Sequence, residues 1–524
     1  MNKIKRLVSY VFIFVVMIVL ASCSKTEFEG DITLSSTRSK ITANVTLGYN
    51  SKIEEGKAKA YLKLYLIDDG EEVYKSADKT LSFGASYTSS SAEFTNLVQE
   101  TEYKIYLYVT YNGKDYKIDS ETITTKPAST EETPEGISNV DELIGMANDP
   151  SGHYELLCDI DFEGATMNEI FTSSTSKQFT GTFDGNGYTI SNFKLKSLTN
   201  IGVFGYIKNA KIKNLNLENV TGDFSTGRST ANIGALCGSA YNSVIENCTV
   251  NGFTLTIQQN SSATINCGGL IGLGENVSIK NSNVENANIT FTRSRYKTSL
   301  GLFAGKLTGI SADNVLVENC YAKGSLTVNC YYPKDGSTYI GGFIGNIGSQ
   351  SLVNNSYVVA DVIVSKYVNS TFEYDFNLAV GGFVGVNNGG SINVTNCLAV
   401  ADITGYAGAV PGEDATVDYT GELFSYTSSV KFGGFAGYLI APYDKIENCY
   451  YVAKTNGISV NAKENKVEED TEVKMLYVEN TVGYEVNPDN IGTINIYTSY
   501  DSAFDYSTLS EELKAVCKDY IVSE

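Results

Sequence analysis

The sequence has no tryptophan, only seven prolines and a single histidine, His153, among its 524 residues. One histidine leaves no His pair, and no Cys-x-x-Cys is present, so the usual zinc ligand patterns are excluded. Scarce proline beside 48 glycines and 36 tyrosines favours β structure with tight turns. Basic residues are also few, 39 against 60 acidic residues, for a net charge of −21. We therefore expect an all-β protein without metal, cofactor or nucleic-acid partner.

Long hydrophobic runs are missing except at the start of the chain. "LVSYVFIFVVMIVL" follows the basic "MNKIKR" and, at 14 residues, is too short for a spanning helix but suits a signal peptide. The next residues, "LASC", resemble a bacterial lipobox in which Cys23 carries the lipid; the alternative is a plain secretory signal. The acidic "SKTEFEGD" resembles the surface-export tags of Bacteroidetes lipoproteins. We predict a signal peptide over 1–22, a tether over 23–29, and lipid anchoring to the outer membrane, facing the cell exterior.

Residues 30–126 predict a small β-sandwich. "YLKLYLI" and "YKIYLYV" alternate with period two, and "YNGK" (111–114) is typical of a tight hairpin. Leu97, Thr101 and Tyr103 have the spacing of a tyrosine corner. The segment resembles a fibronectin type III domain, although Gln99 stands where many members have proline, and the resemblance implies a spacer. An acidic, proline-bearing linker follows over 127–136.

A repeat dominates the rest of the chain, because a glycine motif such as "GGFVG" and an asparagine motif such as "IENC" recur in the same order seven times. The last glycines of the first motif are Gly205, Gly238, Gly272, Gly305, Gly345, Gly385 and Gly437. Their spacings of 33, 34, 33, 40, 40 and 52 indicate insertions into a fixed unit. We expect the glycine motif to be a flat strand that carries two apolar columns. One column is Val203, Leu236, Leu270, Phe303, Phe343, Phe383 and Phe435. The other is Phe204, Cys237, Ile271, Ala304, Ile344, Val384 and Ala436.

The asparagine motif predicts a corner. In "IENCTV", a bend at Asn247 places both Ile245 and Cys248 inside, and asparagine tolerates the left-handed conformation that such a bend needs. The equivalent residues should stack with amide hydrogen bonds between coils. They are Asn214, Asn247, Asn281, Asn319, Asn355, Asn396 and Asn448.

"FTGTFDGNGYTISNFKL" (179–195), followed by these motifs, resembles the GLUG-repeat family of bacterial surface proteins, which includes regions beside immunoglobulin A proteases. The resemblance implies a right-handed parallel β-helix over 137–450 that displays or flanks other modules. Zinc proteases of that group need His-Glu-x-x-His, which one histidine cannot supply. "ISNVDELIGMANDP" (137–150) predicts a capping helix that starts at Ser138 with Asp141. The segment "YELLCDIDF" (154–162) predicts a first strand, and 451–524 predicts a C-terminal cap with a helix over 507–521.

The cysteines and acidic residues have structural explanations. One column of the repeat contains Cys248, Cys320, Cys397 and Cys449 together with leucine and serine. This exchange indicates small buried side chains that fill space in the core. A disulfide between Cys397 and Cys449, on adjacent coils, is the alternative. A calcium site needs six or more oxygen ligands from a shaped loop. A solvated face and a turn are therefore the favoured explanation for Asp159, Asp161, Asp184 and Asn186.

Enzymatic function is the minority hypothesis. A polysaccharide lyase or hydrolase on a β-helix needs converging charged groups, which the repeat positions do not predict, although a carboxylate pair from different coils stays possible. The three inserted segments, 321–339, 365–378 and 401–430, are rich in tyrosine and should extend from one side of the rod. They supply candidate binding residues: Tyr331, Tyr332, Tyr367, Tyr374, Tyr406, Tyr419 and Tyr426. We therefore expect a non-catalytic surface adhesin for a host or microbial surface protein or glycan, with a β-helical carbohydrate-active enzyme or a structural envelope component as alternatives.

Overall fold

The computed structural model describes residues 28–452 and two later strands, and the chain divides into two compact units, 1–128 and 129–524. The later strands are 474–476 and 494–497. Within 28–452 the residues that are not described are 39, 50–52, 54–56, 76–77, 83–87, 96, 197–198, 227–229, 261–262, 295, 310–314, 332–335, 368–376, 388, 408–429, 440–444 and 448. The predicted signal peptide, Cys23 and the helix over 507–521 lie outside the described residues, as does Asn448.

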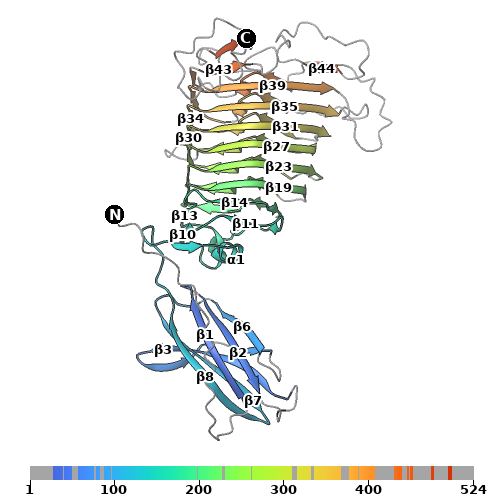
Figure 1. Cartoon of the computed structure of the whole chain (residues 1–524). Helices are drawn as coiled ribbons and strands as arrows, with labels where there is room; N and C mark the ends of the chain where they lie inside the picture. Colours follow the sequence, from blue (N-terminus) through green and yellow to red (C-terminus); the bar gives the residue numbers. More distant parts are fainter. Residues whose placement is uncertain are drawn as a thin grey trace, which may run out of the picture. The chain divides into compact units, whose positions relative to one another are not determined.

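The first unit is a β-sandwich of two antiparallel sheets (Figure 1). One sheet contains β1 (Phe28–Ser36), β2 (Ile41–Tyr49) and β6 (Thr88–Phe94). The other contains β4 (Glu71–Tyr74), β3 (Lys59–Asp68), β7 (Glu102–Tyr111) and β8 (Lys114–Thr124), with β5 (Lys79–Leu81) beside β3. Alternating residues such as Ile41, Leu62 and Ile105 face the buried core between the sheets.

Two local predictions for this unit are confirmed. Asn112 and Gly113 both have positive φ, 49° and 74°, in the turn that joins β7 to β8, so the Asn-Gly pair supplies the tight hairpin. The Tyr103 hydroxyl accepts a hydrogen bond from the backbone N–H of Val98 at 2.9 Å, as in a tyrosine corner. The closer assignment to fibronectin type III stays a prediction.

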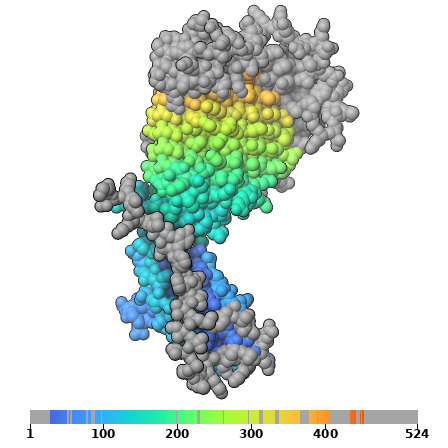
Figure 2. All heavy atoms as spheres, in the orientation of Figure 1, coloured from blue at the N-terminus to red at the C-terminus, as the bar shows by residue number. Residues whose placement is uncertain are grey.

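The second unit is a parallel solenoid in which each coil has four strands. The coil that begins at residue 231 contains β20 (Ala231–Ile233), β21 (Cys237–Tyr241), β22 (Val244–Glu246) and β23 (Thr249–Gln259). The chain then returns to β24 (Ile265–Gly268), which pairs in parallel with β20. Seven such sets of four strands follow one another within the described residues, and Figure 2 shows them as successive bands of sequence colour. The predicted all-β fold with a β-helix is therefore confirmed.

The strands of successive coils build four sheets. Sheet 1 contains β16 (Asn200–Ile201), β20, β24, β28 (Thr298–Gly301), β32 (Ser337–Gly341), β36 (Asn377–Gly381) and β40 (Val430–Gly433). Sheet 2 contains β17 (Tyr206–Lys208), β21, β25 (Ile271–Glu275), β29 (Ala304–Thr308), β33 (Ile344–Ile347), β37 (Val384–Asn387) and β41 (Ala436–Leu439). Sheet 3 contains β9 (Glu135–Ile137), β10 (His153–Leu156), β13 (Thr182–Asp184), β18 (Lys211–Lys213), β22, β26 (Ser278–Lys280), β30 (Val315–Glu318), β34 (Ser351–Asn354), β38 (Ile392–Thr395) and β42 (Lys445–Glu447).

Sheet 4 carries the longest strands, which lie one above another in Figure 1. Its main path is β11 (Ile160–Asp161), β14 (Thr189–Ser191), β19 (Asn216–Thr226), β23, β27 (Asn283–Ser294), β31 (Tyr321–Tyr331), β35 (Tyr357–Tyr367), β39 (Leu398–Ala407), β43 (Cys449–Val452) and β45 (Ile494–Tyr497). Beside this path, β12 (Thr166–Met167) pairs with β15 (Lys194–Leu195), and β44 (Lys474–Leu476) pairs antiparallel with β39. The predicted outward extensions begin as ordinary strands of this sheet, β31, β35 and β39.

The glycine motif is a corner, and the prediction of a flat strand there is wrong. Gly381 ends β36, the chain bends at Gly382 and Phe383, and Val384 begins β37. Consecutive corners touch backbone to backbone, so a Cβ on Gly382 would lie 2.0 Å from the carbonyl oxygen of Gly434. Both predicted apolar columns are nevertheless buried. Phe303, Phe343, Phe383 and Phe435 stack along the axis with ring centroids 4.5, 4.8 and 4.9 Å apart.

The N-terminal end of the solenoid contains the predicted short helix, which follows β9 and starts one residue later than predicted. α1 (Val140–Gly145) is followed by the 3₁₀ turns η1 (Met146–Asn148) and, further on, η2 (Thr175–Lys177). Asn139, not Ser138, is the N-cap, because its side chain accepts from the N–H of Glu142 at 2.9 Å. The single strand predicted over 154–162 is wrong, because the chain turns at 157–159 between β10 in sheet 3 and β11 in sheet 4.

Candidate functional site

The outer face of sheet 3 carries a column of charges that alternate in sign. In its three-residue strands the middle residue, such as Ile212 or Ile245, is buried, so the flanking residues point outward. The parallel register stacks these outward residues in one column, which is Asp184, Lys213, Glu246, Lys280 and Glu318. Opposite charges on adjacent coils attract across the strand spacing. We call this column the charged column.

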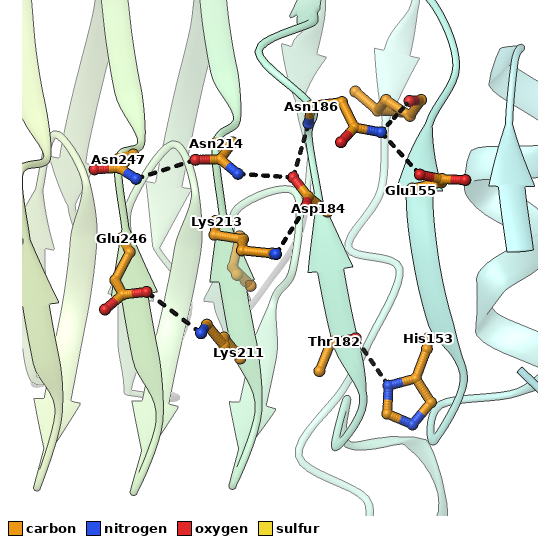
Figure 3. A network of polar contacts seen from close by, with 12 residues as sticks. His153, Glu155, Thr182, Asp184, Asn186, Lys211, Lys213, Asn214, Glu246 and Asn247 are labelled. Atoms are coloured by element: carbon orange, nitrogen blue, oxygen red, sulfur yellow. Dashed lines mark hydrogen bonds and ion pairs between the residues drawn. The ribbon is translucent and has the colours of Figure 1, made fainter. Parts of the chain in front are cut away.

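Ion pairs link the charged column between coils (Figure 3). Lys213 Nζ lies 2.9 Å from Asp184 Oδ2, and Lys280 Nζ lies 3.0 Å from Glu318 Oε2. Lys211, on the same face, lies 3.4 Å from Glu246 Oε2. These side chains are about one-fifth to two-fifths exposed, so each pair contributes little to stability and keeps its charges accessible to a partner.

Asparagines turn the chain at the end of these strands, where six of the seven predicted residues are described. Each of the six has positive φ, between 47° and 55°. Their side-chain amides bond from coil to coil: Asn247 Nδ2 donates to Asn214 Oδ1 at 3.1 Å, and Asn355 Nδ2 donates to Asn319 Oδ1 at 2.7 Å. Asn396 departs from the pattern, because its Nδ2 donates to Asn354 at 3.0 Å.

Asp184 begins this ladder and sets its direction (Figure 3). Its Oδ1 accepts from Asn214 Nδ2 at 2.9 Å, and a carboxylate can only accept. Asn214 must therefore donate toward the first coil, and Asn247 must donate to Asn214 in turn. Partial burial alone would raise the pKa of Asp184, but hydrogen bonds from Lys213, Asn214 and the Asn186 N–H outweigh it and lower the pKa.

The lowered pKa of Asp184 predicts a loss of stability in acid. A carboxyl group whose pKa is lower in the folded state stabilises the fold above its unfolded pKa of about 3.9, and this stabilisation disappears as the pH falls through the folded value. We expect Asp184→Asn to lower stability at neutral pH and to flatten the decline of the thermal midpoint below about pH 4. Thermal unfolding of both proteins across this range measures the difference, and parallel pH profiles would contradict the assignment.

A second asparagine column flanks the same strands and was not predicted. Asn209, Asn242 and Asn276 also have positive φ, and Asn276 Nδ2 donates to Asn242 Oδ1 at 3.1 Å. Its signal is present in the sequence, because each of these residues precedes the asparagine of the first ladder by five positions. Asparagine thus turns the chain at both ends of these strands.

A third ladder begins at Asp161. The Asp161 Oδ1 accepts from Asn192 Nδ2 and from the Glu163 N–H at 3.0 and 2.7 Å, and both hydrogen bonds lower the pKa of Asp161. Asn219 then donates to Asn192 at 3.0 Å. Asp159 accepts from the Thr189 N–H at 2.8 Å. These carboxylates bind backbone and amide donors, and no cluster of metal-ligating side chains occurs in the part of the chain that the structure describes.

A buried polar network lies between sheets 1 and 2. Asn232 Nδ2 donates to Ser239 Oγ at 2.8 Å and to Asn200 Oδ1 at 3.3 Å. Its Oδ1 accepts from Asn266 Nδ2 at 2.8 Å. Asn232 is 8% exposed and Ser239 is fully buried, so these hydrogen bonds replace contacts with water.

His153 lies at the start of sheet 3. Its Nδ1 is 2.8 Å from Thr182 Oγ1 on the next coil (Figure 3). Its backbone N–H donates to Ser129 Oγ at 2.6 Å. Glu155, two residues on, accepts from Asn186 Nδ2 at 3.0 Å. These contacts join the first coils to one another.

The repeat cysteines are buried free thiols. Cys248, Cys320, Cys397 and Cys449 are all unbridged, as small filler predicts, so the alternative disulfide between Cys397 and Cys449 is not formed. Burial, together with the neighbouring Cys449 thiol, raises the pKa of Cys397 well above its ordinary value.

The predicted tyrosine site is described only in part. Tyr331 and Tyr367 end the long strands β31 and β35, Tyr406 is the last residue but one of β39, and Tyr331 pairs in register with Tyr367. Tyr332, Tyr374, Tyr419 and Tyr426 lie outside the described residues. Among the helices of the described residues, none has the length and apolar character to span a membrane.

Comparison with known proteins links part of the chain to a peptidase family. Residues 103–252 match the family described as the M26 IgA1-specific metallo-endopeptidase N-terminal region. A solved structure titled "IgA1 Protease" is similar at a TM-score of 0.41 and 15% identity, over 90% of this chain and 32% of that chain. This chain thus spans about a third of that protein's length. No curated protein matches the chain.

The family match corrects two expectations, the non-catalytic adhesin and the absence of enzymatic function. The sequence has no complete catalytic motif, and adhesion alone was the expectation that followed from this absence. The matched region runs from β7 through β23, and so includes Asp184, Lys213 and Glu246 of the charged column. The match is to the N-terminal region of a peptidase, which a search for catalytic motifs does not detect. The chain is therefore similar, over residues 103–252, to part of an IgA1-specific metallo-endopeptidase.

Proposed function

We propose that this chain takes part in the proteolysis of an immunoglobulin substrate of the IgA1 type, and that it binds the substrate polypeptide. The observation that carries the proposal is the match of residues 103–252 to the N-terminal region of IgA1-specific metallo-endopeptidases.

The lipid anchor predicted at Cys23 would hold this activity at the cell surface, which is a separate proposal. Mass spectrometry of the mature N-terminus tests it, and an unmodified Cys23 would contradict it.

The charged column is the surface that we assign to substrate binding. Its acidic and basic groups alternate at the strand spacing of a parallel sheet, about 4.8 Å per coil. An extended polypeptide has side chains along its length that can pair with both signs. Because the column's own ion pairs are exposed, a substrate can replace them at small energetic cost.

Binding to purified IgA1 tests the proposal. We expect the chain to bind immobilised IgA1 and to bind an unrelated immunoglobulin class more weakly. The double variant Lys213→Glu/Lys280→Glu should bind IgA1 about tenfold more weakly, because it turns the charged column uniformly acidic. Lys208→Glu/Lys323→Glu makes the same change in charge on sheets 2 and 4, so it is the matched control and should bind normally.

The outcomes separate binding from hydrolysis. Failure of the unaltered chain to bind IgA1 would overturn the proposal, and equal loss in both variants would overturn the assignment to sheet 3. In a second arm, IgA1 is incubated with the chain and Zn²⁺ and analysed by mass spectrometry. New IgA1 fragments would extend the function from binding to cleavage.

A further inference from the structure

The outer face of the larger sandwich sheet carries five tyrosines. Inward residues of β3 and β7, such as Leu62, Leu64 and Ile105, are buried in the core, so the alternating residues point outward. The outward tyrosines are Tyr61, Tyr65, Tyr74, Tyr106 and Tyr108. With Lys63, Lys104 and Lys117 on the same sheet, they form what we call the tyrosine–lysine face.

The rings of this face pack against one another. Tyr61 and Tyr108 are stacked with centroids 5.5 Å apart and an interplanar angle of 14°. Tyr65 meets Tyr106 edge to face at 5.3 Å. Mutual packing fixes the rings and turns their faces toward neighbouring rings, so the ring edges are left for a partner.

Lysine ammonium groups lie over the same rings. Lys63 Nζ is 5.4 Å from the centroids of both Tyr61 and Tyr108, and Lys117 Nζ is 4.2 Å from that of Tyr106. The aromatic quadrupole attracts each cation and holds the side chain in place. A partner therefore meets positive charges that have already lost part of their conformational freedom.

The acidic groups of the face already accept hydrogen bonds within it. Glu72 accepts from the Tyr106 hydroxyl at 2.5 Å and from Lys104 Nζ at 2.9 Å, and both bonds lower the pKa of Glu72. Asp115 accepts from the Thr110 hydroxyl at 2.5 Å, and this bond lowers the pKa of Asp115. Asp78 likewise accepts from the Tyr74 hydroxyl at 3.0 Å, so three carboxylates face three lysines. Lys104 is paired with Glu72, whereas Lys63 and Lys117 make no ion pair among the described residues and keep their charges for a partner.

We propose that the tyrosine–lysine face binds a carboxylate-rich polypeptide. The fixed ammonium groups of Lys63 and Lys117 supply donors for carboxylates, while the ring edges supply apolar contact area of the kind that anchors protein interfaces. A sugar that stacks on tyrosine needs an open ring face, and here neighbouring rings and lysines cover the faces. This surface belongs to the first unit, so the proposal goes beyond the IgA1-type function and does not depend on it.

Binding of poly-L-glutamate to the full chain tests this proposal. We expect binding that weakens as salt increases, because the attraction is between charges at the surface. Lys63→Gln/Lys117→Gln should bind at least about tenfold more weakly, since each change removes one charge contact. Lys208→Gln/Lys306→Gln removes the same charge from the solenoid and should bind like the unaltered chain. Circular dichroism confirms that each variant is folded.

A footprint of tyrosine nitration, read by mass spectrometry, locates the bound peptide. Protection of Tyr61, Tyr65 and Tyr74 by poly-L-glutamate is the expected result. Burial, with a hydrogen bond to Asp115, raises the pKa of Tyr61 to about 12, so this hydroxyl is a donor at neutral pH. The proposal would be overturned if poly-L-glutamate did not bind, or if it protected tyrosines elsewhere in the chain. It would also be overturned if both lysine double variants lost the same affinity for poly-L-glutamate. Binding of alginate, a uronate polymer, without binding of poly-L-glutamate would overturn it in favour of a glycan.

Discussion

Replacing Gly342 with alanine is expected to destabilise the solenoid by about 3 kcal/mol, at the upper end of the cost of overpacking. The added Cβ would lie 2.0 Å from the carbonyl oxygen of Gly382 and 3.3 Å from the Cβ of Ala360. The same corner donates its N–H to Gly381 at 2.9 Å, so moving it away breaks backbone hydrogen bonds between coils. Urea unfolding monitored by hydrogen exchange of residues 338–347 measures the effect within this part of the chain.

Gly145→Ala provides the matched control. Gly145 ends α1 with φ −60° and ψ −20°, and nothing lies within 4 Å of the position of its Cβ. Alanine there should leave stability unchanged or raise it by up to about 1 kcal/mol, because alanine favours helix. Equal stability of both variants would show that the corners are looser than their backbone contacts indicate.

Replacing Asn232 with alanine is expected to cost about 2 to 3 kcal/mol. The change removes the acceptor of Asn266 Nδ2 and the donor to Ser239 Oγ, both inside the protein. A buried polar group left without its partner costs about 1–3 kcal/mol. The same urea experiment, monitored at residues of β20 and β24, measures this loss.

The control for this change is Asn251→Ala on sheet 4. Asn251 Oδ1 accepts from Asn286 Nδ2 at 2.8 Å, but this contact is exposed, and water can replace it. We expect a loss below about 0.5 kcal/mol. A comparable loss in both variants would mean that burial between sheets 1 and 2 does not determine the strength of the network.

The coil count and the asparagine corner could be predicted from sequence because the same local chemistry recurs in every coil. Few residues other than asparagine suit a left-handed backbone conformation between two buried residues. The sequence around Asn247 therefore predicts the bend directly. The glycine corner could not be recognised, because glycine is equally compatible with a close-packed strand and with a bend. The neighbouring coil, at Gly434, determines whether the glycines form a strand or a bend, and the position of that coil depends on tertiary structure and not on local sequence.

Function was harder to predict for a related reason. Single residues of the charged column, such as Lys213 and Glu246, look like ordinary surface charges, and only the register between coils makes them a pattern. The tyrosine–lysine face has a clearer signal in "YLKLYLI" and "YKIYLYV", because tyrosine occupies the solvent side of both strands. The predicted binding tyrosines lie instead in the segments inserted between the repeats.

The ladder that begins at Asp184 gives the solenoid a chemical direction. Asn214 and Asn319 each give a hydrogen to the preceding coil and accept one from the coil that comes next. One end is closed by the carboxylate of Asp184, whereas an amide oxygen can accept from a further copy of the same unit. A gene that gains or loses one repeat would therefore make a longer or shorter rod with no new corner chemistry, and its reach could change in steps of one coil.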